Sequence, residues 1–169
     1  MYISSDTNIW FDFEEIGFPE HPFLLDNDYF ISDVTYHDEI RFSETVRRIV
    51  ESNKLHVIPV PSQEIELSIV LAGKYPQITI HDAIALSIAK TRGWILLSGD
   101  GRLRKAAETE SVECHGTLWI YSQLKEQNIL PKEEYLKALE NLLNAVENNR
   151  RRLPESEIIQ MIREAANDR

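Results

Sequence analysis

The stretch Asp82-Ala-Ile-Ala-Leu-Ser-Ile-Ala-Lys90, followed by Trp94-Ile-Leu-Leu97 and Ser98-Gly-Asp100, decides the fold class of this sequence. Residues 82–90 are apolar nearly all round, which predicts a buried helix. Residues 94–97 form a short apolar run that ends at Ser98-Gly99, which is typical of a strand covered on both faces. A buried helix that leads into a buried strand is the repeating unit of an α/β protein.

The same alternation continues on both sides of this stretch. Strands are predicted at residues 2–5, 30–34, 55–60 and around 113–114, and helices at about 37–53, from Pro61 onward and at about 102–109. Apolar strands that alternate with helices indicate a mostly parallel sheet with helices on both faces. The sequence therefore predicts a three-layer α/β/α domain, which we place at residues 1–127.

Residues 128–169 have a different character, because they contain helical stripes and no strand pattern. Pro131 starts one predicted helix, and a second follows Leu153-Pro154. The apolar stripes are Leu136, Leu139, Leu143 and Val146 on the first helix, and Ile158, Ile159, Ile162 and Ala166 on the second. Such stripes have to be buried. We therefore expect a helical extension that packs on the domain or on a dimer partner.

Composition limits the class of protein. The chain has 169 residues, enough for one domain, and 43% of them are hydrophobic and 27% charged, as in ordinary soluble proteins. It contains no apolar run long enough to cross a bilayer and no signal-peptide pattern. Cys114 is the only cysteine, which excludes an intramolecular disulfide and fits a reducing compartment. We therefore expect a cytoplasmic protein with no membrane association.

The net charge of −10 argues against the usual picture of a nucleic-acid binder. An acidic chain repels phosphate at long range and gains little non-specific affinity from its overall field. Binding to RNA would need local basic patches, or bound cations that reverse the charge of an acidic cleft.

Four acidic side chains carry the predicted chemistry. In an open parallel sheet, sites form at the carboxyl ends of the strands. Asp6 ends the first strand, Glu39 follows the second, Asp82 begins the buried helix and Asp100 lies just past the fourth strand. Brought together, four carboxylates repel one another and raise one another's pKa values. A divalent cation such as Mg²⁺ removes that conflict, and it supports phosphodiester hydrolysis through a bound water.

Simpler roles compete for three of these acids. Asp6 suits a turn or a helix cap, Asp82 suits the cap of its own helix, and Asp100 between two glycines suits a turn. A role in metal binding and catalysis is favoured over turns and caps, because all four acids occur at strand ends or helix starts.

Neighbouring polar residues suggest supporting roles. Asn8 and Ser98 are placed to orient carboxylates or metal-bound waters, with helix capping as the alternative. Arg102, Arg104 and Lys105 begin the helix after Asp100, where they either hold RNA phosphates or form a solvated helix face. Residues 150–152 are three arginines, which we expect to serve the end of their helix and to pair with Glu147 rather than to contact RNA.

Several strings resemble the acidic motifs of PIN domains. They are Ser5-Asp6-Thr7-Asn8-Ile9, Asp82-Ala-Ile-Ala-Leu86 and Leu97-Ser-Gly-Asp100-Gly-Arg-Leu-Arg104, with Gly116-Thr117-Leu118 similar to a later signature. The resemblance implies a Rossmann-like PIN fold and an endoribonuclease that depends on Mg²⁺ or Mn²⁺. Because the sequence contains no base-reading motif, we expect it to cleave exposed single-stranded RNA. The resemblance also implies a homodimer. The VapC-like members are toxins of toxin–antitoxin pairs, so the resemblance extends to a partner antitoxin protein.

The middle acid of the motif is open between neighbouring residues. We choose Glu39 because it precedes Ile40, as the acid of PIN domains precedes a branched apolar residue. Asp38 is the alternative, and Asp33 is placed inside the strand, where a local hydrogen bond is expected.

Three other functions compete with the ribonuclease. A non-catalytic PIN-fold module would bind RNA or protein, but it has no reason to keep the full acidic set. A phosphohydrolase for small esters would need a glycine-rich phosphate loop or an Asp-x-Asp acceptor, which we do not find. The pairs His37-Asp38 and His81-Asp82 suggest a helical phosphohydrolase, but the predicted strands contradict an all-helical fold.

Overall fold

The computed structural model describes residues 1–40 and 43–167 of the chain. Five strands form its sheet: β1 (Tyr2–Ser5), β2 (Asp28–Ser32), β3 (Leu55–Ile58), β4 (Ile95–Leu97) and β5 (Cys114–His115). The helices are α1 (Thr7–Glu15), α2 (Asp33–Thr35), α3 (Glu44–Glu51), α4 (Ser62–Lys74), α5 (Ile80–Arg92), α6 (Gly101–Thr109), α7 (Thr117–Glu126), α8 (Lys132–Glu147) and α9 (Glu155–Asn167). A 3-10 turn, η1 (His21–Leu24), and a π-helical turn, η2 (Tyr36–Ile40), complete the described elements.

The sheet is parallel throughout, with strand order β3-β2-β1-β4-β5. The chain builds the sheet outward from β1 in both directions, so the order reverses at β1. Ligands of open α/β sheets bind where this reversal leaves a crevice at the carboxyl ends of the strands. Ser5 pairs with Leu97 in register, and the Asp6 amide donates to the Leu97 carbonyl at 2.9 Å. The first residues beyond β1 and β4 are therefore held side by side.

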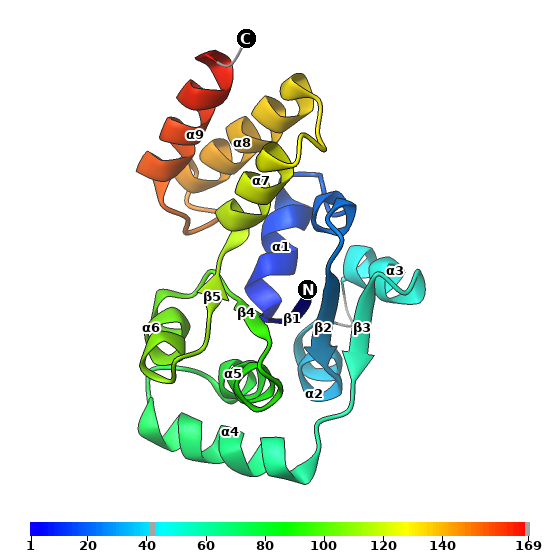
Figure 1. Ribbon diagram of the computed structural model, residues 1–169, viewed down its shortest axis with the longest axis vertical. Coiled ribbons are helices and arrows are strands. Elements are labelled where there is room, and N and C mark those ends of the chain that lie inside the picture. The colour runs from blue at the N-terminus through cyan, green and yellow to red at the C-terminus, as the bar shows by residue number, and fades with distance from the viewer. Residues whose placement is uncertain (41–42, 168–169) are drawn as a thin grey trace.

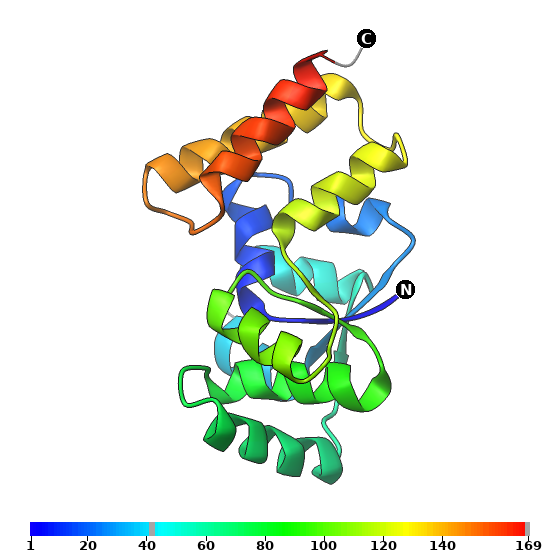
Figure 2. The ribbon, with the colours of Figure 1, turned by 60° about the vertical axis from the view of Figure 1, so that its left-hand side comes forward.

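Helices cover both faces of the sheet, which confirms the predicted α/β/α layers (Figures 1 and 2). On one face, Ile3, Ile31 and Leu97 share a buried cluster with side chains of α1, α3 and α7. On the other, Leu96 packs with apolar residues of α4, α5 and α6. The Ser4 hydroxyl donates to the Ala85 carbonyl at 3.0 Å, which fixes β1 against α5. As predicted from its sequence, α5 is buried along most of its length.

The segment after β2 differs from the continuous helix predicted for residues 37–53. Strand β2 ends at Ser32, two residues earlier than predicted, because the Ser32 hydroxyl accepts the Thr35 amide at 2.9 Å and starts α2. Ser43 caps a separate helix by accepting the Val46 amide, and part of the predicted helix, residues 41–42, lies outside the described residues. The Ser43 cap thus lies inside the predicted helix and starts a new one, while the π-helical turn η2 lies between the Ser32 and Ser43 caps.

The C-terminal helices pack onto the domain itself. The buried cluster that contains Ile3, Ile31 and Leu97 of the sheet extends into both helices. It includes Leu139 and Leu142 of α8 and Ile158, Met161 and Ala165 of α9. The buried stripe of α9 is turned from the predicted one, because Met161 and Ala165 are buried while Ala166 is exposed. Within the described ranges, no helix is both long enough and apolar enough to cross a membrane.

Candidate active site

Asp6 lies at the switch point of the sheet, between the ends of β1 and β4. Its side chain is 5% exposed, and its Oδ2 accepts hydrogen bonds from the Ser98 hydroxyl at 2.9 Å and the Asn8 amide at 3.4 Å. Burial, reinforced by the charge of Asp82, raises the pKa of Asp6 from 3.8 to about 7, although the hydrogen bonds partly oppose this. A carboxyl group with this pKa is poised to lose its proton when a cation binds.

Asp82 helps to cap its own helix and also lies near the other acids. Thr79, not Asp82, is the N-cap of α5, and the two residues form a capping box: the Asp82 carboxylate accepts the Thr79 amide at 2.7 Å, and the Thr79 hydroxyl accepts the Asp82 amide at 3.1 Å. Burial raises the pKa of Asp82, and the charges of Asp100 and Glu39 raise it further. The capping role is thus real, and it leaves Asp82 within electrostatic reach of the other three acids.

Asp100 is the N-cap of α6. Its Oδ1 accepts the amides of Arg102 at 2.7 Å and Leu103 at 3.0 Å, so the expected turn role is also present. The Asp100 amide donates to the Ser98 hydroxyl, which itself donates to Asp6. Ser98 therefore links the two acids that follow β1 and β4, and it fixes their relative positions.

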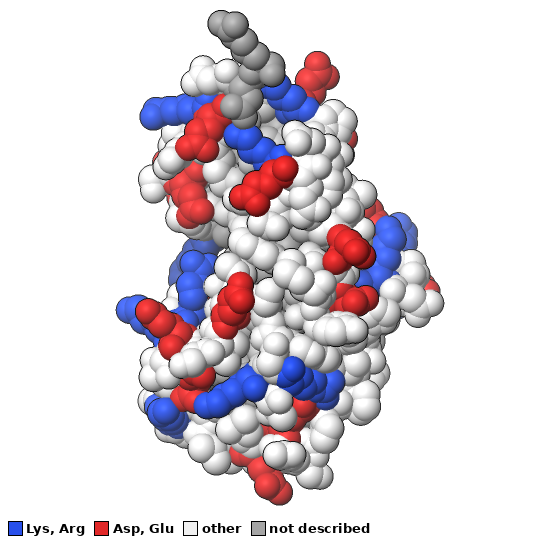
Figure 3. All heavy atoms as spheres, in the orientation of Figure 1, with Lys and Arg blue, Asp and Glu red and all other residues white. Residues whose placement is uncertain are grey.

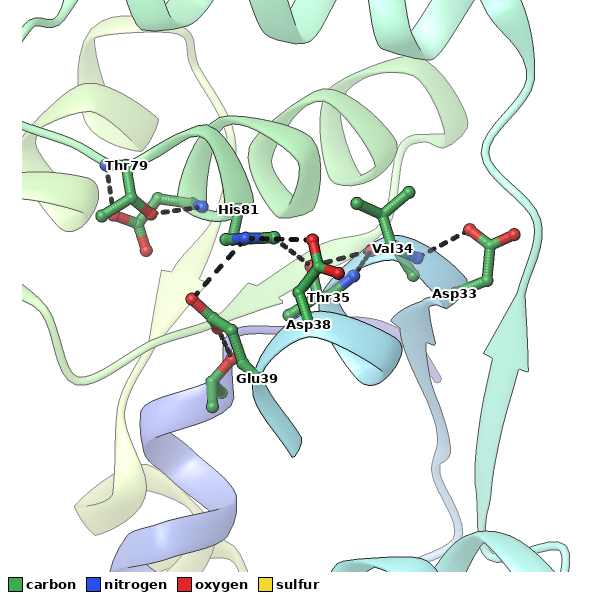
Figure 4. Close-up of polar contacts among 10 residues, drawn as sticks. Asp33, Val34, Thr35, Asp38, Glu39, Thr79 and His81 are labelled. Carbon is green, nitrogen blue, oxygen red and sulfur yellow. Dashed lines mark hydrogen bonds and ion pairs between the residues drawn. The ribbon is translucent and has the colours of Figure 1, made fainter. Parts of the chain in front are cut away.

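Glu39 and Asp38, the two candidates for the middle acid, both lie on the π-helical turn η2 (Figure 4). Of the two, Glu39 lines a cavity together with Asp6, Asp82 and Asp100. The hydroxyl of Thr7 donates to the Glu39 carboxylate, which ties the π-helical turn η2 to the start of α1. The side chain of Asp38 is 60% exposed, lies 3.7 Å from the His81 imidazole and does not line that cavity. Asp33, predicted inside the strand, begins α2 and accepts the Val34 amide at 2.8 Å. A π-helical turn is frequent at functional sites, and here it carries Glu39.

All four predicted acids line one cavity of about 340 Å³, which we call the acidic cavity. Its wall is completed by Thr7, Asn8, Phe11 and Thr79, so none of the eight described residues that line it is a lysine or arginine. Four carboxylates with no basic partner on this wall are the oxygen donor set that Mg²⁺ or Mn²⁺ prefers. The residues therefore fit a divalent metal ion.

The carboxylates are not gathered as tightly as metal ligands. Among the described residues, no three His, Cys, Asp or Glu side chains form a cluster close enough to hold an ion directly. The carboxylates stay apart because three of them accept other hydrogen bonds. Asp82 accepts one from the Thr79 amide, Asp100 from the Arg102 amide, and Glu39 from the Thr7 hydroxyl. Because Mg²⁺ usually keeps several waters and takes only one or two carboxylates directly, this spacing is compatible with binding.

The basic residues predicted beside Asp100 do not line the acidic cavity. Arg102 and Lys105 are exposed on α6. Arg104 donates to the Ser98 carbonyl at 3.4 Å and borders a different cavity, near Cys114 and Trp119. The interpretation of a solvated helix face thus fits Arg102 and Lys105, whereas Arg104 points towards β5.

One acid near the site has no counterpart among the predicted residues. Asp12 of α1 is 5% exposed, accepts the Thr117 hydroxyl at 2.5 Å, and has its pKa raised by burial to about 6. The signal available was an acid inside the apolar run of residues 9–13. His81, for which the sequence suggests either a structural role or support of the acids, lies 3.4 Å from the Thr35 hydroxyl and 3.9 Å from Glu39 (Figure 4).

Comparison with known proteins identifies the family. The model of the family DUF3368, described as a PIN domain, matches residues 3–167, which is nearly the whole chain. No curated protein and no solved structure matches the chain. PIN domains are generally nucleases, and they typically use divalent metal ions. The parallel sheet, the four acids at its carboxyl edge and the family match agree, and the chain belongs to the PIN domain family.

Proposed function

We propose that the protein is a metal-dependent endoribonuclease that cleaves single-stranded RNA at the acidic cavity. The observation that carries this proposal is the convergence of Asp6, Glu39, Asp82 and Asp100 on one cavity at the switch point of the sheet. Membership of a family of nucleases supports the general class of reaction. The choice of RNA, and of single strands, follows the resemblance and the usual preference of RNA-binding proteins for exposed bases.

The four acids would hold one or more Mg²⁺ or Mn²⁺ ions. When bound, such an ion neutralises charge on the scissile phosphate and lowers the pKa of a water that attacks it. The protein keeps the Asp6 carboxyl group buried yet able to ionise. Hydrogen bonds from Ser98 and Asn8 fix its orientation. Thr7 holds Glu39 across the cavity from another element, so the spacing of the acids does not depend on any single helix.

Cleavage assays with purified protein test this proposal. Asp6→Asn keeps the size of the side chain but removes its charge, and we expect it to reduce RNA cleavage to the level of buffer alone. EDTA should do the same to the wild type, and added Mg²⁺ or Mn²⁺ should restore cleavage. Equal residual activity in wild type and Asp6→Asn would indicate a contaminating nuclease. Absence of cleavage by a metal-loaded wild type would favour the non-catalytic binding module.

A matched pair of variants tests which neighbour is the middle acid. Glu39→Gln should abolish cleavage, because Glu39 lines the acidic cavity, whereas Asp38→Asn should leave it unchanged, because Asp38 faces His81 and solvent. The reverse result would assign the role to Asp38. The role of a toxin, its antitoxin partner and the homodimer stay predictions from the resemblance. A small open reading frame that overlaps this one upstream would favour the toxin.

A further inference from the structure

A second cavity adjoins the acidic one. It measures about 270 Å³ and is bordered by Asn8, Asp12, Gly99 and Asp100 on one side and by residues 149–152 on the other. Asn8 and Asp100 also line the acidic cavity, so the two cavities share a wall. Because three of its eight described lining residues are Arg150, Arg151 and Arg152, we call it the arginine cavity.

The backbone at the end of α8 directs these arginines to the sheet. Asn149 adopts the left-handed conformation, with φ of 56°. The Asn149 amide donates to the Val146 carbonyl, and the Arg150 and Arg151 amides both donate to the Ala145 carbonyl, which closes a Schellman-type turn. The connection between α8 and α9 then passes beside α1 (Figures 1 and 2). A hydrogen-bonded turn therefore leads directly into the three arginines.

The arginines do not make the contacts that their sequence suggested. Arg150 pairs with Glu15 of α1 rather than with Glu147. The Arg151 side chain lies over the Phe11 ring at 5.8 Å from its centroid, and its Nε is 3.5 Å from Asp12 Oδ1. The sequence alone places these residues at the end of their own helix, since only the fold brings α1 beside the turn.

Arg151 is held in the fold by an ion pair rather than by a hydrogen bond. Its Nε atom is buried and makes no hydrogen bond within residues 1–40 and 43–167, but it lies 3.5 Å from Asp12 Oδ1. The side chain as a whole is 23% exposed and lines the cavity, and Arg152 borders the same cavity with an exposed side chain. By formal charge the lining carries three arginines against Asp12 and Asp100. Because Arg150 and Arg151 are already paired with Glu15 and Asp12, the exposed Arg152 is the arginine best placed to bind an anion.

We propose that the arginine cavity binds a backbone phosphate of the RNA, next to the phosphate at which the acidic cavity acts. This inference rests on the proposed function, and it adds a positioning site for the substrate strand. Guanidinium groups bind phosphate through paired, charge-assisted hydrogen bonds, and such contacts set the register of a strand without reading its sequence. The site also explains how a chain with a net charge of −10 binds a polyanion: the attraction is local.

A purely structural role is the alternative, in which the arginines only hold the α8–α9 turn against α1. That role accounts for Arg150 with Glu15 and for Arg151 with Asp12. It gives no role to Arg152, which lies exposed on the cavity wall. The two roles predict different effects on RNA binding.

The experiment measures RNA binding without cleavage. A short single-stranded RNA of mixed sequence is titrated with the full-length Asp6→Asn protein in Mg²⁺, and fluorescence anisotropy is followed at several salt concentrations. Arg151→Gln and Arg152→Gln are added singly to this background. The control is Arg163→Gln, which removes the same charge from an exposed position of α9 outside both cavities. Thermal unfolding checks that each variant is folded, and the exposed Arg152 keeps the test valid if Arg151→Gln is unstable.

We expect each cavity variant to weaken binding on the order of tenfold, while Arg163→Gln leaves it nearly unchanged. The dependence of log affinity on log salt should also become shallower by about 0.7 for each lost phosphate contact. The loss should be similar for RNAs of different sequence. Binding and salt dependence equal to those of the control variant would overturn the inference, and so would an absence of any RNA binding. Arginine-dependent binding without cleavage by the wild type would instead contradict the proposed ribonuclease and leave this site standing.

Discussion

At the scale of the residue, the burial of Asp6 lowers the stability of the folded chain. The folded pKa of Asp6, about 7, lies above the ordinary value of 3.8, because the carboxylate is buried beside Asp82. Between these two pH values the folded chain binds a proton that the unfolded chain releases. The free energy of unfolding therefore falls as pH rises through this window, and the cost is complete above pH 7.

This cost predicts that Asp6→Asn stabilises the metal-free protein. In EDTA at pH 8, the variant should be more stable than the wild type by on the order of 2 kcal/mol, and the difference should vanish near pH 4. Urea unfolding at the two pH values measures both effects. Asp38→Asn, whose side chain is 60% exposed, serves as the control and should show no comparable dependence on pH. A wild type that is the more stable protein at pH 8 would contradict the buried, proton-binding Asp6.

At the scale of the element, the C-terminal helices are part of the core rather than an appendage. Ile158 of α9 is fully buried in the cluster that also contains residues of β1, α1 and α7, whereas Ile159 is only partly buried. Adjacent isoleucines on one helix therefore differ in the apolar surface that they remove from water. The helices also fix the arginine cavity, because the turn between them supplies residues 149–152.

The two isoleucines give a matched test of this packing. Ile158→Ala should cost about 2–4 kcal/mol of stability, since it removes buried methyl groups and leaves a cavity. Ile159→Ala should cost clearly less. For a domain of this size the larger loss corresponds to a fall in Tm of about 4–16 °C, measured by thermal unfolding. Deletion of residues 153–169 should give unstable or insoluble protein. A truncated chain as stable as the intact one would show that α9 is dispensable.

At the scale of the whole molecule, the acidic cavity joins segments that are distant along the chain. Asp6 follows β1, Glu39 belongs to η2, Asp82 to α5, and Asp100 caps α6. An ion held by these residues binds the folded chain and not the unfolded one. Acidic and basic side chains are interspersed over the face shown in Figure 3, so attraction of metal or RNA depends on the local cavities.

Linkage therefore predicts that Mg²⁺ or Mn²⁺ raises the Tm of the wild type. An ion at a concentration one hundred times its Kd adds about 2.7 kcal/mol to the free energy of unfolding. The corresponding rise in Tm is about 5–11 °C for a domain of this size. Thermal unfolding with and without the ion measures it, and Asp6→Asn should respond much less. An equal rise in both proteins would place the ion away from Asp6.

Local sequence determined those features of the protein that arise from residues close together in the chain. Apolar runs were enough to predict the parallel sheet and the buried α5, because hydrophobic patterning is written residue by residue. The four acids are predicted from their places near strand ends and helix starts and from the resemblance to PIN domains, and the structure brings them to one cavity. Only the tertiary structure decided the rest. The π-helical turn that carries Glu39 to this cavity, the burial that raises the pKa of Asp6, and the meeting of Arg151 with Asp12 join residues far apart in the chain. No periodicity records such contacts, because they arise when packed elements bring distant side chains into one environment of low dielectric constant.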